Sequence, residues 1–136
     1  MERISLTEAG KYILDDVVAA IIALVPQDRG DKFDANTKQL HETFRDLRDR
    51  YTILAGQLNF SEEDVFPFSR QLEEALATLE LSRIIGMENP DYTSYLIKDE
   101  GRQFVKDRLL PLFAPEEKQQ LEEMAGEFAR RCNVRR

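Results

Sequence analysis

The sequence has few of the residues from which reactive sites are built. Its 136 residues include one cysteine, one histidine and no tryptophan. The lone Cys132 excludes an internal disulfide and a multi-cysteine zinc site, and it fits a reducing compartment. No motif surrounds it, so we interpret it as a buried residue of the last helix rather than a reactive thiol. The six glycines match neither a phosphate-binding loop nor a dinucleotide fingerprint.

Long apolar runs are missing as well. The longest run, Val17 to Val25, spans nine residues, whereas a helix needs about 20 residues to cross a bilayer. No long apolar segment with a small-residue cleavage site follows Met1, so we expect no secretory signal. These absences predict a soluble, cytoplasmic protein without a membrane segment.

Low-complexity tracts, internal repeats and long linkers are also absent, and the composition is that of a folded domain. Hydrophobic residues make up 42% of the chain and charged residues 33%, which is too apolar a balance for intrinsic disorder. At this length one hydrophobic core suffices without disulfides or metal. We therefore predict a single domain over residues 1–136.

Positive charge is scarce outside the C-terminal stretch. The formal net charge is −7, from 26 acidic and 19 basic residues. Four of the basic residues lie together near the C-terminus, namely Arg130, Arg131, Arg135 and Arg136. The rest of the chain would repel a phosphate backbone unless its cations gather on one face. Charge alone thus disfavours nucleic acid as a partner.

Periodic apolar residues predict two helices in the first half of the chain. The first runs from Thr7 to Val25, and its continuous apolar second half indicates a central packing position. Residues 27–34 are expected to form a loop. The second helix is capped by Asp34 or Asn36, and Ile53 to Leu58 continue it as a further short helical turn. Its inner residues at helical spacing are Leu40, Phe44, Leu47 and Tyr51.

A capped helix and a hairpin are predicted next. Ser69 is placed to cap a helix that runs to about Arg83, and Pro67 holds the approach to it extended. Two short β-rich runs on either side of Asn89-Pro90-Asp91 then indicate a β-hairpin over residues 84–97. This order of elements, with a hairpin directly after a capped helix, is that of a winged helix.

Two further helices are predicted after the hairpin. Asp99 is expected to cap the first, and the final helix, about residues 115–132, opens with Pro115. The final helix carries an apolar stripe, which comprises Leu121, Met124 and Phe128. This stripe either lies at the interface of a homodimer or closes the core of the monomer. The predicted fold class is mainly α (α+β), with a winged-helix-like centre and a two-stranded hairpin, flanked by N- and C-terminal helices.

Short motifs add a resemblance to a family. They are Thr37-Lys38 with Leu40, Pro67-Phe68-Ser69, Ile84-Ile85, and Tyr95-Leu96-Ile97 before Glu100-Gly101. With them, roughly residues 10–110 resemble the SocA-like (Panacea) antitoxin and related uncharacterised winged-helix families. The resemblance implies a winged-helix fold and either protein–protein binding or DNA-linked regulation.

No arrangement of residues in the sequence predicts catalysis. His41 has no cysteine or second histidine at metal-ligand spacing, so we expect it in a surface or half-buried structural position. The acidic pairs are adjacent in sequence, so their side chains diverge on a helix and form no acid–base dyad. We therefore expect no enzyme, no catalytic or metal-binding residues and no cofactor.

We therefore expect the protein to act by contact with another macromolecule. The leading hypothesis is a protein-interaction or antitoxin-like regulatory module with a protein partner. The alternative is a DNA-binding transcriptional regulator that uses helix 69–83, with the C-terminal arginines as a phosphate clamp. Its candidate DNA contacts are Lys38, Ser69, Arg70 and Gln71. Against it, helix 69–83 carries two arginines and three glutamates.

Overall fold

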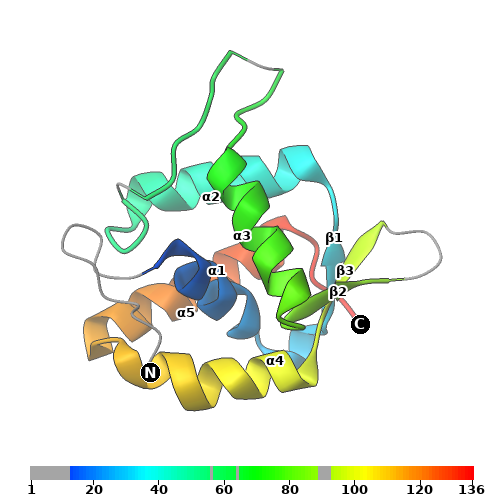
Figure 1. Ribbon diagram of the computed structural model, residues 1–136, viewed down its shortest axis with the longest axis vertical. Coiled ribbons are helices and arrows are strands. Elements are labelled where there is room, and N and C mark those ends of the chain that lie inside the picture. Colours follow the sequence, from blue (N-terminus) through cyan, green and yellow to red (C-terminus); the bar gives the residue numbers. More distant parts are fainter. Residues whose placement is uncertain (1–12, 56, 64, 89–92) are drawn as a thin grey trace.

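The computed structural model describes residues 13–136 apart from residues 56, 64 and 89–92 (Figure 1). Its α-helices are α1 (Leu14–Ala23), α2 (Thr37–Arg50), α3 (Arg70–Leu81), α4 (Asp99–Phe104) and α5 (Pro115–Arg131). Its strands are β1 (Lys32–Asp34), β2 (Ile85–Met87) and β3 (Ser94–Ile97). The predicted class, mainly α with a small antiparallel sheet, is confirmed. Within the described residues, no helix combines the length and apolar character that crossing a membrane requires.

Helix α1 lies at the centre of the molecule. Every residue from Asp16 to Ala23 is buried, which is expected of a helix that is apolar on all sides. Figure 1 shows α1 between α3, α4 and α5, and α1 packs against both α3 and α5. The predicted central position is confirmed for residues 14–23, and the predicted part before Ile13 lies outside the described residues.

Helices α2 and α3 begin at side-chain caps, as predicted. The Asn36 side-chain oxygen accepts a hydrogen bond from the Gln39 amide at 2.9 Å. The Ser69 hydroxyl accepts one from the Leu72 amide at 3.2 Å. Each cap satisfies an amide that has no partner within its helix. After α2, residues 52–55 form turns rather than the further helical turn that we expected.

The predicted hairpin is confirmed, and it belongs to a three-stranded sheet. Strand β2 pairs antiparallel with β3, with Ile85 opposite Ile97. Strand β1 pairs with the other side of β3, which gives the order β1-β3-β2. The loop expected over residues 27–34 is therefore wrong for its last three residues. Phe33, at the middle of β1, is fully buried and stacks on Tyr95 at 5.2 Å between ring centroids.

The last third of the chain turns from the sheet back to α1. The expected Asp99 cap is wrong, because Lys98 holds the cap position without a side-chain bond and Asp99 is the first helical residue. Gly101 lies so close to Ile84 that a Cβ atom would overlap the Ile84 backbone. The chain continues as the π-helical turn η2 (Val105–Leu109) and the 3-10 turn η3 (Leu110–Leu112). Helix α5 then opens with Pro115, as predicted.

Candidate interaction surface on α3 and the preceding arm

The connection between α2 and α3 contains a projecting segment, and we call its described residues, 59–63 and 65–69, the arm. Figure 1 shows it rising beyond the helices and returning to the start of α3. Two backbone hydrogen bonds close its base: the Ser61 amide donates to the Phe68 carbonyl at 2.8 Å, and the Phe68 amide donates back to the Ser61 carbonyl at 3.1 Å. The arm is therefore a loop with a paired base.

His41 joins the arm to both neighbouring helices. Its Nδ1 accepts a hydrogen bond from the Ser69 amide at 2.9 Å, so the neutral ring carries its proton on Nε2. Nε2 donates to the Glu73 carboxylate at 2.8 Å. The ring also stacks on Phe68, with centroids 4.7 Å apart and planes 8° apart. The expected surface or half-buried position is wrong, because His41 is 0% exposed.

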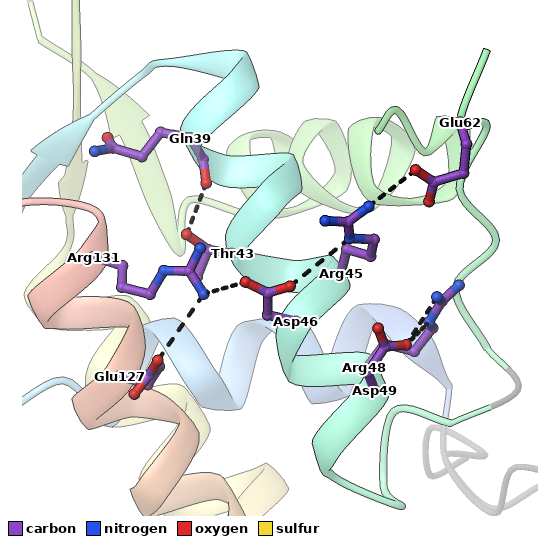
Figure 2. Close-up of polar contacts among 9 residues, drawn as sticks. All are labelled: Gln39, Thr43, Arg45, Asp46, Arg48, Asp49, Glu62, Glu127 and Arg131. Carbon is purple, nitrogen blue, oxygen red and sulfur yellow. Dashed lines mark hydrogen bonds and ion pairs between the residues drawn. The ribbon is translucent and has the colours of Figure 1, made fainter. Parts of the chain in front are cut away.

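Further contacts fix the first half of the arm. The Arg48 guanidinium lies over the Phe60 ring at 5.2 Å and donates to the Leu58 carbonyl at 3.1 Å. The Asn59 amide donates to the Gln71 side-chain oxygen at 2.8 Å. Figure 2 shows Arg45 of α2 reaching Glu62 of the arm, at 2.9 Å. The hydrogen bond to Glu62 is the main reason that the pKa of Arg45 is raised.

The outward face of α3 is acidic. Glu73, Glu74 and Glu80 are exposed, and Arg70 is the one basic residue within the helix. Tyr95 of β3 is close enough to this face that burial, and then the charges of Glu80 and Glu73, raise its pKa. The exposed face of α3 therefore carries more negative than positive charge.

The four predicted DNA contacts fall into two groups. Lys38 on α2 and Arg70 at the start of α3 are exposed. Ser69 is 0% exposed and is occupied by its cap bond, and Gln71 is occupied by the Asn59 amide. The cap bond of Ser69 was predicted, whereas the bond of Gln71 was not, because its partner Asn59 belongs to the arm and lies outside α3. The Ser69 side chain thus caps the start of α3, and the Gln71 side chain holds the arm against that helix.

The C-terminal arginines bind within the chain. Figure 2 shows Arg131 of α5 reaching Asp46 of α2, at 2.7 Å. Arg130 pairs with Glu127 at 2.6 Å, and its hydrogen bond is the main reason that the pKa of Glu127 is lowered. Arg135 pairs with Asp34 at 2.8 Å. Because three of the four guanidinium groups contact carboxylates, they are poorly placed to clamp phosphate.

The apolar stripe of α5 lies inside the monomer. Leu121, Met124 and Phe128 are each 0% exposed. The Phe128 ring packs on Phe33 at 5.0 Å and on Phe44 at 5.8 Å. The structure favours the second of our two interpretations, in which the stripe closes the core, because these side chains offer no surface to a second chain.

A buried arginine holds the end of α1. Arg102 of α4 is 9% exposed and donates to the carbonyls of Val25, of Gly30 at 2.9 Å and of Ala23 at 3.4 Å. Burial lowers its pKa. A hollow of about 430 Å³ opens beside it, lined by the end of α1 and by α4. Because both terminal nitrogens of Arg102 already bond to carbonyls, we interpret Arg102 as structural. Among the described residues, no group of three metal-ligating side chains converges.

Comparison of the chain with protein-family models, with curated proteins and with solved structures gives no match. No relative therefore supplies a function or a site residue. The resemblance to SocA-like antitoxins and the winged-helix assignment stay predictions.

Proposed function

We propose that the chain is a non-enzymatic winged-helix protein that works by macromolecular contact, as a protein-interaction or antitoxin-like regulatory module in the cytoplasm. The order α1, β1, α2, α3, β2, β3 supports the winged-helix part of the proposal, with a hairpin directly after the capped α3. In this arrangement α3 holds the recognition position and the hairpin is the wing.

The negative charge of α3 favours a protein partner over DNA. Its exposed glutamates face outward at the position from which a recognition helix contacts base edges. Phosphate would be repelled there, whereas a basic protein surface would be attracted and steered toward it. A protein partner with Lys or Arg at its contact surface is therefore favoured.

The length of the connection before α3 supports the same choice. In helix-turn-helix proteins that bind DNA, the two helices are joined by a turn of about three or four residues. Here the connection runs from Tyr51 to Ser69, and the arm projects beside the start of α3. The N-terminal residues of a recognition helix are those that contact bases, so the arm stands where DNA would approach.

The alternative, a DNA-binding regulator, is supported by two exposed cations, Lys38 on α2 and Arg70 at the start of α3. Fluorescence anisotropy with a random-sequence DNA duplex, at low and at raised salt, separates the two functions. We expect no binding at either salt concentration. Tight binding at low salt that fades as salt rises would favour the alternative.

The protein-contact function is tested by charge reversal on α3. The double variant Glu74→Lys/Glu80→Lys changes two exposed residues, and Glu122→Lys on the exposed face of α5 is the matched control. Calorimetry with a partner purified from the native host should show at least a tenfold loss of affinity for the double variant. Equal affinity of the double variant and the control would contradict the proposal.

A further inference from the structure

The hollow beside Arg102 has two chemically different walls. Its volume is about 430 Å³, and pockets that hold small ligands measure roughly 300–1,000 Å³. One wall is apolar and is formed by residues 23–26, at the end of α1 and just after it. The other wall is polar and comprises Asp99, Arg102, Gln103 and Lys106. The hollow therefore suits a small ligand that has both apolar and polar groups.

The polar wall is one face of the helical segment 99–106. Its residues recur at steps of three, one and three, which keeps them on the same side of a helix. Arg102 is fixed in the middle of this face by its bonds to the Val25 and Gly30 carbonyls. Its Nε is buried without an acceptor among the described residues, and a buried donor is normally satisfied by a bound group. The wall is thus preformed and still has an unsatisfied donor.

Asp99 and Lys106 place opposite charges at the two ends of the polar wall. Both side chains are exposed, and neither forms an ion pair with another residue of the described chain. A carboxylate attracts an ammonium group, and an ammonium group attracts a carboxylate. The polar wall is therefore complementary to a zwitterion.

The spacing of these two charges sets the size of the zwitterion. Asp99 and Lys106 are seven residues apart, which is about 10 Å along a helix. An extended peptide covers roughly 3.3–3.6 Å per residue. A peptide of about two or three residues therefore places its terminal ammonium and carboxylate groups at a matching separation.

We propose that the hollow is a binding site for a free di- or tripeptide. Asp99 binds the terminal ammonium group of the peptide, Lys106 binds its carboxylate, and its apolar side chains pack on residues 23–26. The site adds a small ligand to a protein that we propose to act by macromolecular contact, and neither proposal depends on the other.

Nuclear magnetic resonance of the ¹⁵N-labelled full chain tests the position of the site, with the tripeptide Ala-Leu-Ala as the probe. We expect the amide signals of Val25, Gln27 and Gln103, which line the hollow, to shift at millimolar peptide. The amide signals of the arm should stay unchanged. An absence of shifts at millimolar peptide, or shifts confined to residues away from the hollow, would overturn the proposal.

Blocked forms of the same tripeptide test the two charge contacts. The N-acetylated form lacks the ammonium group, and the C-terminal amide lacks the carboxylate. Each should bind about three- to tenfold more weakly than the free tripeptide, because each loses one ion pair that is partly exposed to solvent. Equal affinity of the free and blocked forms would show that the hollow does not recognise a zwitterion.

Two variants assign each charge contact to its residue. On Asp99→Asn the free and N-acetylated tripeptides should bind equally, and on Lys106→Gln the free and C-amidated tripeptides should bind equally. The matched controls are Glu100→Gln and Arg108→Gln, which change exposed charges of the same segment outside the lining of the hollow. Both controls should discriminate between the three peptides as the wild type does. Circular dichroism melting checks that every variant keeps its fold.

Two outcomes of the variant series contradict these assignments. Asp99→Asn or Lys106→Gln could keep the discrimination of the wild type, or a control could lose it to the same extent. Either result would mean that Asp99 and Lys106 do not hold the ends of the peptide.

Discussion

Two sides of this molecule differ in whether their largest apolar side chains are buried or exposed. On the closed side, around α1 and α5, Phe128 and its neighbours are 0% exposed. On the open side, formed by the arm and α3, Val65 and Leu81 are 95% and 86% exposed. Burial on the closed side stabilises the fold, whereas the exposed side chains of Val65 and Leu81 contribute little to the stability of the free chain. Substitutions on the two sides should therefore separate stability from binding.

The largest effect on stability is expected at the centre of the closed side. Phe128→Ala removes a ring that contacts Phe33 and Phe44, and the cavity should lower the free energy of unfolding by about 3–5 kcal/mol. Urea denaturation measures this loss. Phe128→Leu is the control and should cost less, because it keeps most of the apolar volume. A Phe128→Ala variant as stable as the wild type would mean that α5 does not close the core.

A smaller loss of stability is expected when the buried polar residue Arg102 is replaced. Arg102→Met keeps the length of the side chain but leaves the carbonyls of Ala23, Val25 and Gly30 without their donor. Buried carbonyls without a partner should lower the free energy of unfolding by about 2–3 kcal/mol. Arg102→Lys retains a donor, so its loss in the same denaturation assay should be smaller. Equal stability of the two variants would contradict the role of these hydrogen bonds.

Cys132 makes stability on the closed side depend on alkaline pH. Burial raises the pKa of its thiol from 9.0 to about 11. Because the folded state holds this proton more tightly than the unfolded state, the stabilisation is complete below pH 9 and is lost as the pH rises toward 11. The loss should be on the order of 2 kcal/mol, measured as the difference between wild type and Cys132→Ala at each pH. Parallel pH profiles of the two proteins would contradict this account.

A local loss of stability is expected at His41, which connects the arm to α2 and α3. His41→Leu removes the acceptor of the Ser69 amide and should lower the free energy of unfolding by about 1–2 kcal/mol. The loosened arm should also be cut faster by chymotrypsin at its phenylalanines. Glu73→Gln keeps an oxygen that accepts from His41 Nε2 and serves as the control. If cleavage of the arm is no faster in His41→Leu, His41 does not position the arm.

The smallest effect is expected from the ion pairs between α2 and α5. Asp46→Ala removes one of the two carboxylates that Arg131 contacts, and the Arg131 side chain is 26% exposed. Because solvent screens such a pair, the free energy of unfolding should fall by only about 0.5 kcal/mol. The fall should shrink further at high salt, which a thermal melt at two salt concentrations measures. A loss above 2 kcal/mol would show that this network belongs to the core.

Local signals in the sequence were sufficient for most of the helices and for the hairpin. The caps at Asn36 and Ser69 and the helix start at Pro115 are set by nearby residues, and they are confirmed. Strand β1 was missed because its three residues carry no strand pattern of their own. It exists because β3, some 60 residues later, supplies its hydrogen bonds.

The candidate site was harder to predict because its contacts join distant residues. His41 is 28 residues from Ser69 and 32 from Glu73, so spacing gave no sign that it was buried between them. Arg102 lies 72 residues from Gly30, and an arginine on a charged helix is usually exposed. By contrast, the acidic character of α3 was visible in its composition, because the charges of a single helix need no tertiary contact to be counted.

One detail of the sheet bears on when this protein can fold during its synthesis. The outer edge of β1 is paired with Arg135, through amide–carbonyl bonds of 3.0 and 2.8 Å in both directions with Lys32. Helix α1 also packs against α5, which lies near the other end of the sequence. A nascent chain therefore cannot complete the packing of α1 on α5 or the pairing of the outer edge of β1 until residue 135 has been synthesised. Until then the face of α1 that α5 covers is exposed, and a chaperone would need to shield it.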